Sequence, residues 1–205
     1  MITMTAEPVG SNCGAGGVKI QVGLDNGDGE GTANDGTLQP DEVDQTSYVC
    51  NGLSGRVVFV TSTTTNGDLG GLTGADAMCQ TRANAAGLQG QFLAWLSDSS
   101  QSPSTRFVHS SAPYVLVDGT QIASNWAGLT SGTLDHYITL DEAGATGPTS
   151  VWTGTRDDGT VEGPFTCEDW TIPFAPGAYG FSGGDWTDEE IDDCNSAKAL
   201  YCFQQ

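Results

Sequence analysis

Six cysteines are spread along the 205-residue chain without a C-x-x-C pair, at Cys13, Cys50, Cys79, Cys167, Cys194 and Cys202. Zinc sites and redox motifs usually show that close spacing, whereas an even and widely spaced set is typical of a disulfide framework. Disulfides persist in oxidising compartments. The cysteines therefore predict a secreted, periplasmic or cell-surface protein.

Acidic residues outnumber basic ones 26 to 6, which gives a formal net charge of −20. Phosphate binding requires clustered Lys and Arg, so this composition argues against nucleic acid and against an anionic membrane surface as partners. Two interpretations of the carboxylates remain. They form a solvated surface that keeps the protein soluble, or many of them converge on divalent cations.

The 29 glycines predict a loop-rich fold with many turns. No run of about 18 apolar residues occurs, so we expect no membrane-spanning helix. Residues Met1 to Pro8 lack the charged and apolar regions of a signal peptide, so a native export leader is expected to be missing from this sequence. We expect residues 1–12 to be a disordered or vector-derived tail.

Residues 13–52 have the features of a small separate unit. Apolar residues alternate with polar ones over 18–22, as in a short strand, and a second apolar patch lies at 48–49. The unit is too short to bury much core. A bridge between Cys13 and Cys50 would close its ends and contribute about 3–4 kcal/mol.

Between these strands lies an Asp-, Asn- and Gly-rich loop that resembles an oxygen-ligand loop. Calcium takes six to eight oxygens, with carboxylates at alternate positions, a Gly at the sharp turn and a bidentate Glu at the end. If Asp35 is the fifth ligand position, Gly36 is the sixth and Glu42 the twelfth. The stretch 30–34 has no counterpart in a standard loop, so the loop is an enlarged variant. The candidate ligands are Asp25, Asp28, Asp35, Asp41 and Glu42, with Asn34 as a substitute. An Asp/Gly turn without metal is the alternative, and magnesium fits less well because its geometry is stricter.

The segment from Gly16-Gly-Val-Lys-Ile20 to Tyr48-Val-Cys-Asn-Gly52 resembles a small repeat of exported bacterial proteins. The resemblance covers about a fifth of the chain. It implies a calcium-stabilised spacer rather than an activity.

Residues 56–205 have the features of a larger α+β domain with more loop than regular structure. The helix with the clearest signals is 73–86, with Thr73 as the expected cap, and a short helix is expected at 92–96. Apolar runs predict four strands, at 56–61, 114–117, 151–154 and 200–203.

This larger domain resembles the C-type-lectin-like fold, including the bacterial endostatin-like surface proteins. The resemblance rests on 59–76 (Phe-Val-Thr-Ser-Thr-Thr-Thr-Asn-Gly-Asp-Leu-Gly-Gly-Leu-Thr-Gly-Ala-Asp), Val151-Trp-Thr-Gly-Thr155 and Leu200-Tyr-Cys-Phe-Gln204. It implies two disulfides, Cys79–Cys202 and Cys167–Cys194. It also implies that the protein binds extracellular proteins or glycans.

The calcium-lectin signature itself is absent, because neither Glu-Pro-Asn nor Gln-Pro-Asp occurs in the long-loop region and Trp-Asn-Asp is matched only in part by Trp186-Thr187-Asp188. Sugar binding is therefore not inherited from the resemblance. We still expect at least one calcium here, because clustered carboxylates repel one another unless a cation neutralises them. A solvated acidic face is the alternative. The candidate ligands are Asn66, Asp68, Asp76, Asp157, Asp158, Glu162, Asp188 and Asp192.

The tryptophans at 126, 170 and 186 lie in expected loops, where an indole ring can present a stacking surface. Packing over a thin core is the simpler interpretation.

No nucleophile elbow, phosphate loop or H-E-x-x-H motif occurs, so the sequence does not predict a particular catalytic mechanism. His109 and His136 are the side chains that normally titrate near neutrality, and Asp135 adjoins His136. A calcium-polarised carbonyl attacked by water, with a histidine as base, would hydrolyse a small ester or lactone such as an acyl-homoserine lactone. The two resulting hypotheses are a calcium-binding module for extracellular ligands and a calcium-dependent hydrolase.

Overall fold

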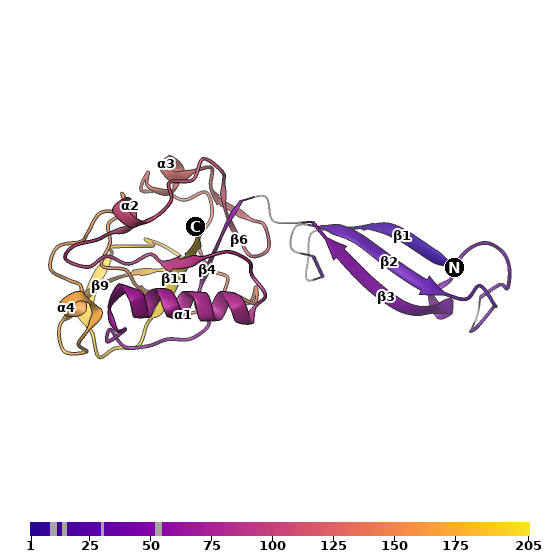
Figure 1. The fold of residues 1–205 in the computed structure, drawn as a ribbon, viewed down its shortest axis with the longest axis horizontal. Helices are drawn as coiled ribbons and strands as arrows, with labels where there is room; N and C mark the ends of the chain where they lie inside the picture. Colours follow the sequence, from indigo (N-terminus) through magenta and orange to yellow (C-terminus); the bar gives the residue numbers. More distant parts are fainter. Residues whose placement is uncertain (9–11, 14–15, 30, 52–54) are drawn as a thin grey trace. The chain divides into compact units, whose positions relative to one another are not determined.

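The computed structural model describes residues 1–8, 12–13, 16–29, 31–51 and 55–205. The chain divides into two compact units, Met1–Leu53 and Ser54–Gln205, which we call unit 1 and unit 2. In Figure 1 unit 1 is the indigo and violet end of the ribbon.

Unit 1 is a three-stranded antiparallel sheet in the order β1-β2-β3. The strands are β1 (Ile2–Glu7), β2 (Gly17–Gly23) and β3 (Val43–Cys50), and the 3₁₀ turn η1 (Pro40–Glu42) precedes β3. The prediction of a disordered tail over residues 1–12 was wrong for β1. In β1, Ile2 lies opposite Val22 of β2, Met4 opposite Ile20 and Ala6 opposite Val18. This segment therefore has a strand partner.

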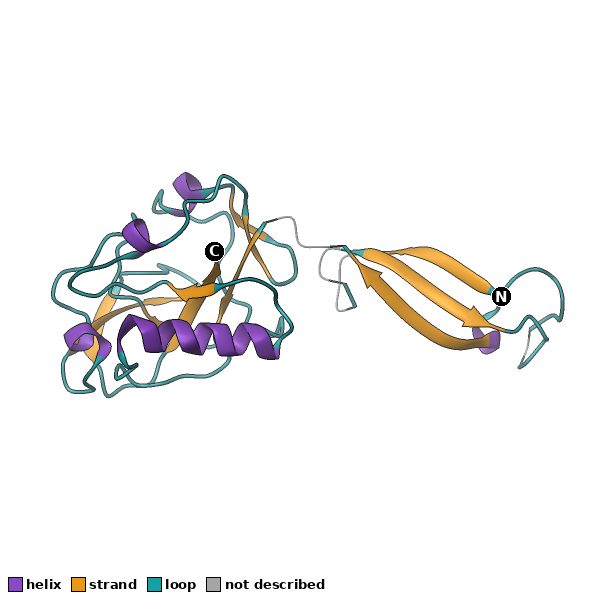
Figure 2. Cartoon of the chain, in the orientation of Figure 1, coloured by secondary structure: helices purple, strands orange, loops and turns teal. Residues whose placement is uncertain are grey.

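Unit 2 is built on an 8-stranded mixed sheet in the order β10-β9-β8-β11-β4-β6-β7, with β5 paired to β11. Short strands and long loops dominate it, as the colouring of Figure 2 shows. The strands are β4 (Arg56–Val60), β5 (Phe92–Ala94), β6 (Tyr114–Leu116), β7 (Gln121–Ala123), β8 (Ser150–Trp152), β9 (Pro176–Phe181), β10 (Glu190–Asp193) and β11 (Ala199–Gln204). The predicted α+β class and the four predicted strand positions are confirmed.

Four helical segments accompany the sheet: α1 (Gly71–Ala85), α2 (Pro103–Arg106), α3 (Trp126–Leu129) and α4 (Cys167–Trp170). Helix α1 begins two residues before the predicted Thr73, because Gly70 occupies the cap position in the left-handed conformation (φ 76°). The predicted helix over 92–96 was wrong. Its first residues form β5, which pairs with the end of β11, so sheet pairing overrides the local helix preference.

The four residues of α4 all have positive φ, between 51° and 63°. They form a left-handed turn rather than a right-handed helix. Such a conformation costs roughly 1–2 kcal/mol per residue for L-amino acids. The surrounding contacts hold it: Cys167 is disulfide-bonded, and Trp170 is fully buried with its Nε1 donating to the carbonyl of Ser97.

The core of unit 2 is aromatic. Trp95 is fully buried, and the rings of Trp186, Phe203, Phe107 and Trp126 lie around it with centroid distances of 4.7, 5.4, 5.8 and 5.9 Å. The loop tryptophans therefore pack against the core instead of presenting free stacking surfaces.

Three disulfides are present, Cys13–Cys50, Cys79–Cys202 and Cys167–Cys194, which are the expected pairs. The first closes unit 1, the second joins α1 to β11 and the third joins α4 to the residue that follows β10. These bonds agree with an oxidising extracellular or periplasmic compartment. Within the described ranges, no helix is long and apolar enough to cross a membrane.

Candidate functional site

A cavity of about 830 Å³ opens among three loops of unit 2. The first loop follows α3, the second follows β8 and the third connects β9 to β10. The lining residues are Gly132, Thr133, Leu134, Asp135, His136, Tyr137, Asp157, Gly184, Asp185, Trp186, Thr187, Asp188 and Glu189. We call this the acidic cavity, because the lining includes five carboxylates and neither Lys nor Arg.

Buried hydroxyl groups fix the floor of the acidic cavity. The Oγ1 of Thr187 accepts a hydrogen bond from Trp95 Nε1 at 2.9 Å and donates one to the carbonyl of Thr155 at 2.5 Å. The hydroxyl of Thr153 donates to the carbonyl of Thr187. Thr187 is only 2% exposed, so the backbone on either side of it is held against the core. This anchoring sets the position of the neighbouring Asp188.

Negative charge is crowded at this site. Partial desolvation raises the pKa of Asp188, and the charges of Glu162 and Asp157 raise it further, while Arg156, which pairs with Glu162 at 2.6 Å, offsets part of this rise. At the rim, the charge of Asp185 is the largest factor that raises the pKa of Glu189. Each ionised carboxylate therefore makes ionisation of its neighbours less favourable, which is the electrostatic condition that a bound cation relieves.

His136 lies in the acidic cavity, but not as part of a His–Asp pair. Its Nδ1 lies 2.8 Å from the carbonyl of Gln121, and a carbonyl can only accept, so Nδ1 carries the proton and the Nε2 lone pair of the neutral ring is left available. The carboxylate of Asp135 accepts from the side-chain amide of Gln121 at 3.1 Å instead. His136 thus has the tautomer that a general base requires. The neighbouring Asp135 does not orient its ring, although their adjacency in the sequence suggested such a pair.

His109 lies outside the acidic cavity. Its ring stacks on Trp126 with a centroid distance of 4.0 Å, and its Nε2 lies 3.0 Å from the carbonyl of Ser104. These contacts give the ring a packing role.

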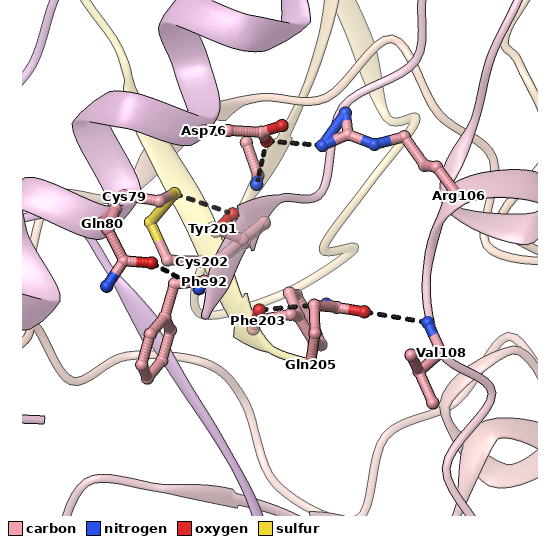
Figure 3. A network of polar contacts seen from close by, with 11 residues as sticks. Asp76, Cys79, Gln80, Phe92, Arg106, Val108, Tyr201, Cys202, Phe203 and Gln205 are labelled. Carbon is pink, nitrogen blue, oxygen red and sulfur yellow. Dashed lines mark hydrogen bonds and ion pairs between the residues drawn. A yellow bond between two sulfur atoms is a disulfide. The ribbon is translucent and has the colours of Figure 1, made fainter. Parts of the chain in front are cut away.

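Asp76 is engaged in a structural network (Figure 3). Its Oδ1 accepts from the backbone N–H of Ala94 at 2.9 Å and from the guanidinium of Arg106. The Arg106 side chain is 9% exposed, so Asp76 neutralises an almost buried cation. The structure therefore does not support the predicted joint metal site of Asp76 with Asn66 and Asp68, because a cation on this carboxylate would displace the nearly buried guanidinium of Arg106.

The other predicted ligands of unit 2 lie in different places. Asn66 and Asp68 form a local turn in which the Asn66 side chain accepts from the Asp68 N–H. Asp158 accepts from the backbone and hydroxyl of Thr160, and Asp192 pairs with Lys198 at 2.7 Å. Only Asp157 and Asp188 line the acidic cavity, with Glu162 close enough to affect the pKa of Asp188.

The loop of unit 1 is organised around two of its predicted ligands. Glu42 is 2% exposed, and its two oxygens accept from the N–H groups of Gly27 (2.7 Å) and Gln39 (3.0 Å). Asp25 accepts from the N–H groups of Asp35 and Gly36. The side-chain oxygen of Gln39 is buried without a hydrogen-bond partner. Of the other predicted ligands, Asp28 accepts from Asn26 and Asp35 accepts from Gln39, while Asp41 lies beside Gly29.

Across the part of the chain that the structure describes, no three His, Cys, Asp or Glu side chains stand in an arrangement that would hold a metal ion. What the fold assembles from the sequence-based candidates is a partial donor set, with Asp157, Asp188, Asp135 and His136 around one cavity. Tyr137 and the loop 132–134 were not among the residues that the sequence predicted for the site. The run Asp135-His136-Tyr137 could have indicated these residues, because it places an aromatic ring beside two polar groups in an expected loop.

The fold and the cavity define a disulfide-bonded α+β domain with an acidic, loop-lined site, preceded by a small single-sheet unit. Residues 62–186 match the family described as "Protein of unknown function (DUF1554)", and the chain belongs to this family. Residues 1–50 match the "Domain of unknown function (DUF7151)". No curated protein matches the chain.

Proposed function

We propose that this protein is an exported, calcium-dependent binding module with a C-type-lectin-like fold that holds an extracellular protein or glycan ligand in the acidic cavity. The observation that carries the proposal is the cavity itself, in which carboxylates from three loops surround a space of about 830 Å³. A concave site with a few convergent polar groups is the usual form of a ligand site.

The arrangement of the disulfides supports the lectin-like part of the proposal. The first helix is bonded to the last strand through Cys79 and Cys202, and an inner bridge links Cys167 to Cys194 within the long-loop region. Those are the two bonds that the resemblance implied. The cavity also includes Trp186, Thr187 and Asp188, the stretch that partly matches the calcium-lectin signature.

The donor chemistry supports calcium at the acidic cavity. Asp157 and Asp188 supply hard oxygens, and calcium completes its shell with backbone carbonyls, hydroxyls and water. A bound calcium would offset the desolvation and the carboxylate repulsion that together raise the pKa of Asp188, and it would offer coordination positions to oxygens of the ligand. The chain's own residues would orient the ligand through Tyr137, which is 53% exposed, and through the carboxylates of the rim.

A second calcium is proposed for the loop of unit 1. Here the supporting observations are the buried carboxylate of Glu42 and the buried, unpartnered oxygen of Gln39. Buried oxygens without donors are costly unless a partner satisfies them. Calcium in this loop would have a structural role, because the unit has little core of its own.

The test measures calcium binding and ligand capture together. Wild-type protein, Asp188→Asn and Glu168→Gln are compared by calorimetric calcium titration and on glycan and extracellular-matrix protein arrays, with calcium and with a chelator. Glu168 is an exposed carboxylate that does not line the acidic cavity, so Glu168→Gln controls for loss of one charge. We expect Asp188→Asn to lose both capture and one calcium-binding event. Capture that survives both the chelator and Asp188→Asn would refute the proposal.

The tautomer of His136 favours one alternative, a calcium-dependent hydrolase of small esters or lactones. A free Nε2 lone pair at a cavity is what a general base requires. Turnover of an acyl-homoserine lactone that disappears with a chelator and in His136→Gln, but not in His109→Gln, would replace the binding function with this one.

A further inference from the structure

A second cavity, of about 380 Å³, lies in unit 2 where helix α1, the loop after β4 and the strand β11 meet. It shares no lining residue with the acidic cavity. Four threonines, three apolar side chains and Arg82 line it, and no carboxylate is among these described residues. We call it the threonine cavity. Its lining is therefore positively charged, in a chain that carries 26 acidic and 6 basic residues.

Hydrogen bonds to β11 fix the loop that forms one wall of the threonine cavity. The Oγ1 of Thr61 accepts from the N–H of Leu200 at 3.0 Å and donates to the carbonyl of Thr63 at 2.8 Å. Thr65 and Lys198 exchange two backbone hydrogen bonds, both of 2.9 Å. Leu200 is 2% exposed and Thr61 is 3% exposed, so they form the buried part of the lining. The cavity is thus formed without a ligand, as is usual for small-molecule sites.

Arg82 is the basic group of this cavity. In the described structure its ion pair is with Glu142, at an Nη1–Oε1 distance of 3.9 Å, which is too long for a hydrogen bond. Glu142 instead accepts from the backbone N–H and the hydroxyl of Ser62, at 2.9 and 2.5 Å. The other bases of unit 2 each donate to an oxygen of the chain: Arg56, Arg106, Arg156 and Lys198. Arg82 therefore keeps donors that a ligand can use.

The remaining walls define what else the ligand contains. Ala77, Met78 and Leu200 present apolar surface to the cavity. The loop adds the hydroxyls of Thr63 and Thr65, which are able to donate to an oxygen of the ligand. One positive charge beside an apolar surface suits a molecule with one anionic end and a short hydrocarbon body.

We propose that the threonine cavity binds a small organic acid, with its carboxylate on Arg82 and its aliphatic part against Met78 and Leu200. A planar guanidinium binds a carboxylate through two parallel hydrogen bonds, which supply both strength and orientation. A neutral apolar molecule would leave Arg82 unused, and an amine would be repelled by it. A phosphate ester would bring about two negative charges to a single cation. This site is separate from the calcium-dependent one and needs no calcium.

The first test uses hexanoate as the probe. It is titrated into the ¹⁵N-labelled full chain in the presence of a chelator, and amide chemical shifts are followed by NMR. We expect saturable shifts at Thr63, Thr65 and Arg82, and much smaller ones with hexan-1-ol or with hexylamine, which is protonated at neutral pH. Arg82→Gln should weaken hexanoate binding at least about tenfold, because it removes a charge-assisted hydrogen-bond donor. Lys19→Gln, which removes one positive charge from unit 1, should bind hexanoate like the wild type.

The second test fills the cavity and leaves Arg82 in place. Ala77→Phe adds a ring at an exposed position of α1 that lines the threonine cavity, so hexanoate binding should be lost. Thr73→Phe, at an exposed position of α1 that does not line it, should bind like the wild type. Hexanoate that binds Arg82→Gln as tightly as the wild type overturns the proposal. Shifts that hexan-1-ol reproduces, or the absence of saturable shifts at millimolar hexanoate, overturn it as well.

Discussion

Lys198 is the basis of the prediction that the structure defines most sharply. Its side chain is 7% exposed, and its ammonium lies 3.8 Å from the ring centroid of Tyr179 and 4.8 Å from that of Trp152. Its Nζ also lies 2.7 Å from the Oδ2 of Asp192. The ammonium therefore joins the edge strand β10 to the interior of the sheet through one carboxylate and two aromatic faces.

The cation–π contacts and the ion pair contribute differently to the free energy of unfolding. A desolvated cation–π contact contributes about 2 kcal/mol. The ion pair contributes at most about 1 kcal/mol, because the Asp192 side chain is 38% exposed and solvent screens it. Lys198→Met keeps the hydrocarbon stem, so packing is largely retained. We expect Lys198→Met to lower the free energy of unfolding by about 2 kcal/mol, and Asp192→Asn to lower it by less than about 1 kcal/mol.

Guanidinium unfolding followed by tryptophan fluorescence is the suitable assay, because all five tryptophans of the chain lie in unit 2. The order of the two variants is the critical result. If Asp192→Asn proves as destabilising as Lys198→Met, the ion pair dominates and the reasoning from the aromatic faces is refuted. An unchanged midpoint for Lys198→Met would refute both contributions.

Three further predictions concern calcium, pH and packing. Glu42→Gln should lower the melting temperature of the calcium-loaded protein and abolish much of the shift that calcium gives in the wild type, measured by calorimetry with and without a chelator. The raised pKa of Asp188 means that the folded state favours its neutral form, so this group adds stability at low pH and loses it as pH rises through the folded pKa. Calcium-free wild type should thus gain stability relative to Asp188→Asn as pH falls through that pKa, and added calcium should remove this difference, as thermal melts of both proteins over a pH series will show. Gly177→Ala should cost about 1–3 kcal/mol, since its Cβ would lie 2.6 Å from Cys167 Sγ, whereas Gly183→Ala, with open space around it, should melt like the wild type.

Local sequence signals predicted those parts of the fold that depend on local or covalent constraints. Alternating apolar residues identified β2 and β4, and the cysteine set identified a disulfide framework. Strand β5 was mistaken for a helix because its state depends on pairing with β11, more than 100 residues further on. No residue pattern within 92–96 indicates that this segment pairs with β11.

The candidate site was predicted only in part, for a similar reason. Acidity identified Asp157 and Asp188, but the acidic character of a segment does not reveal which side chains meet. Asp76 appeared equally suitable as a ligand until the fold brought Arg106 against it from 30 residues away. The sequence distance between the three loops of the acidic cavity hid their convergence, and only the topology brings 132–137 next to 184–189.

Strand β11 has a consequence for how such a domain is made. It is the last strand of its sheet along the chain, yet it pairs with β4, β5 and β8 and carries the cysteine that bonds to α1. Until residues 199–204 are available, the earlier strands lack their central partner and their apolar faces have nothing to close against. A chain that emerges from its N-terminal end therefore stays open until this strand arrives. The Cys79–Cys202 disulfide can likewise form only after this strand is available, so oxidation of that pair marks the completion of the sheet.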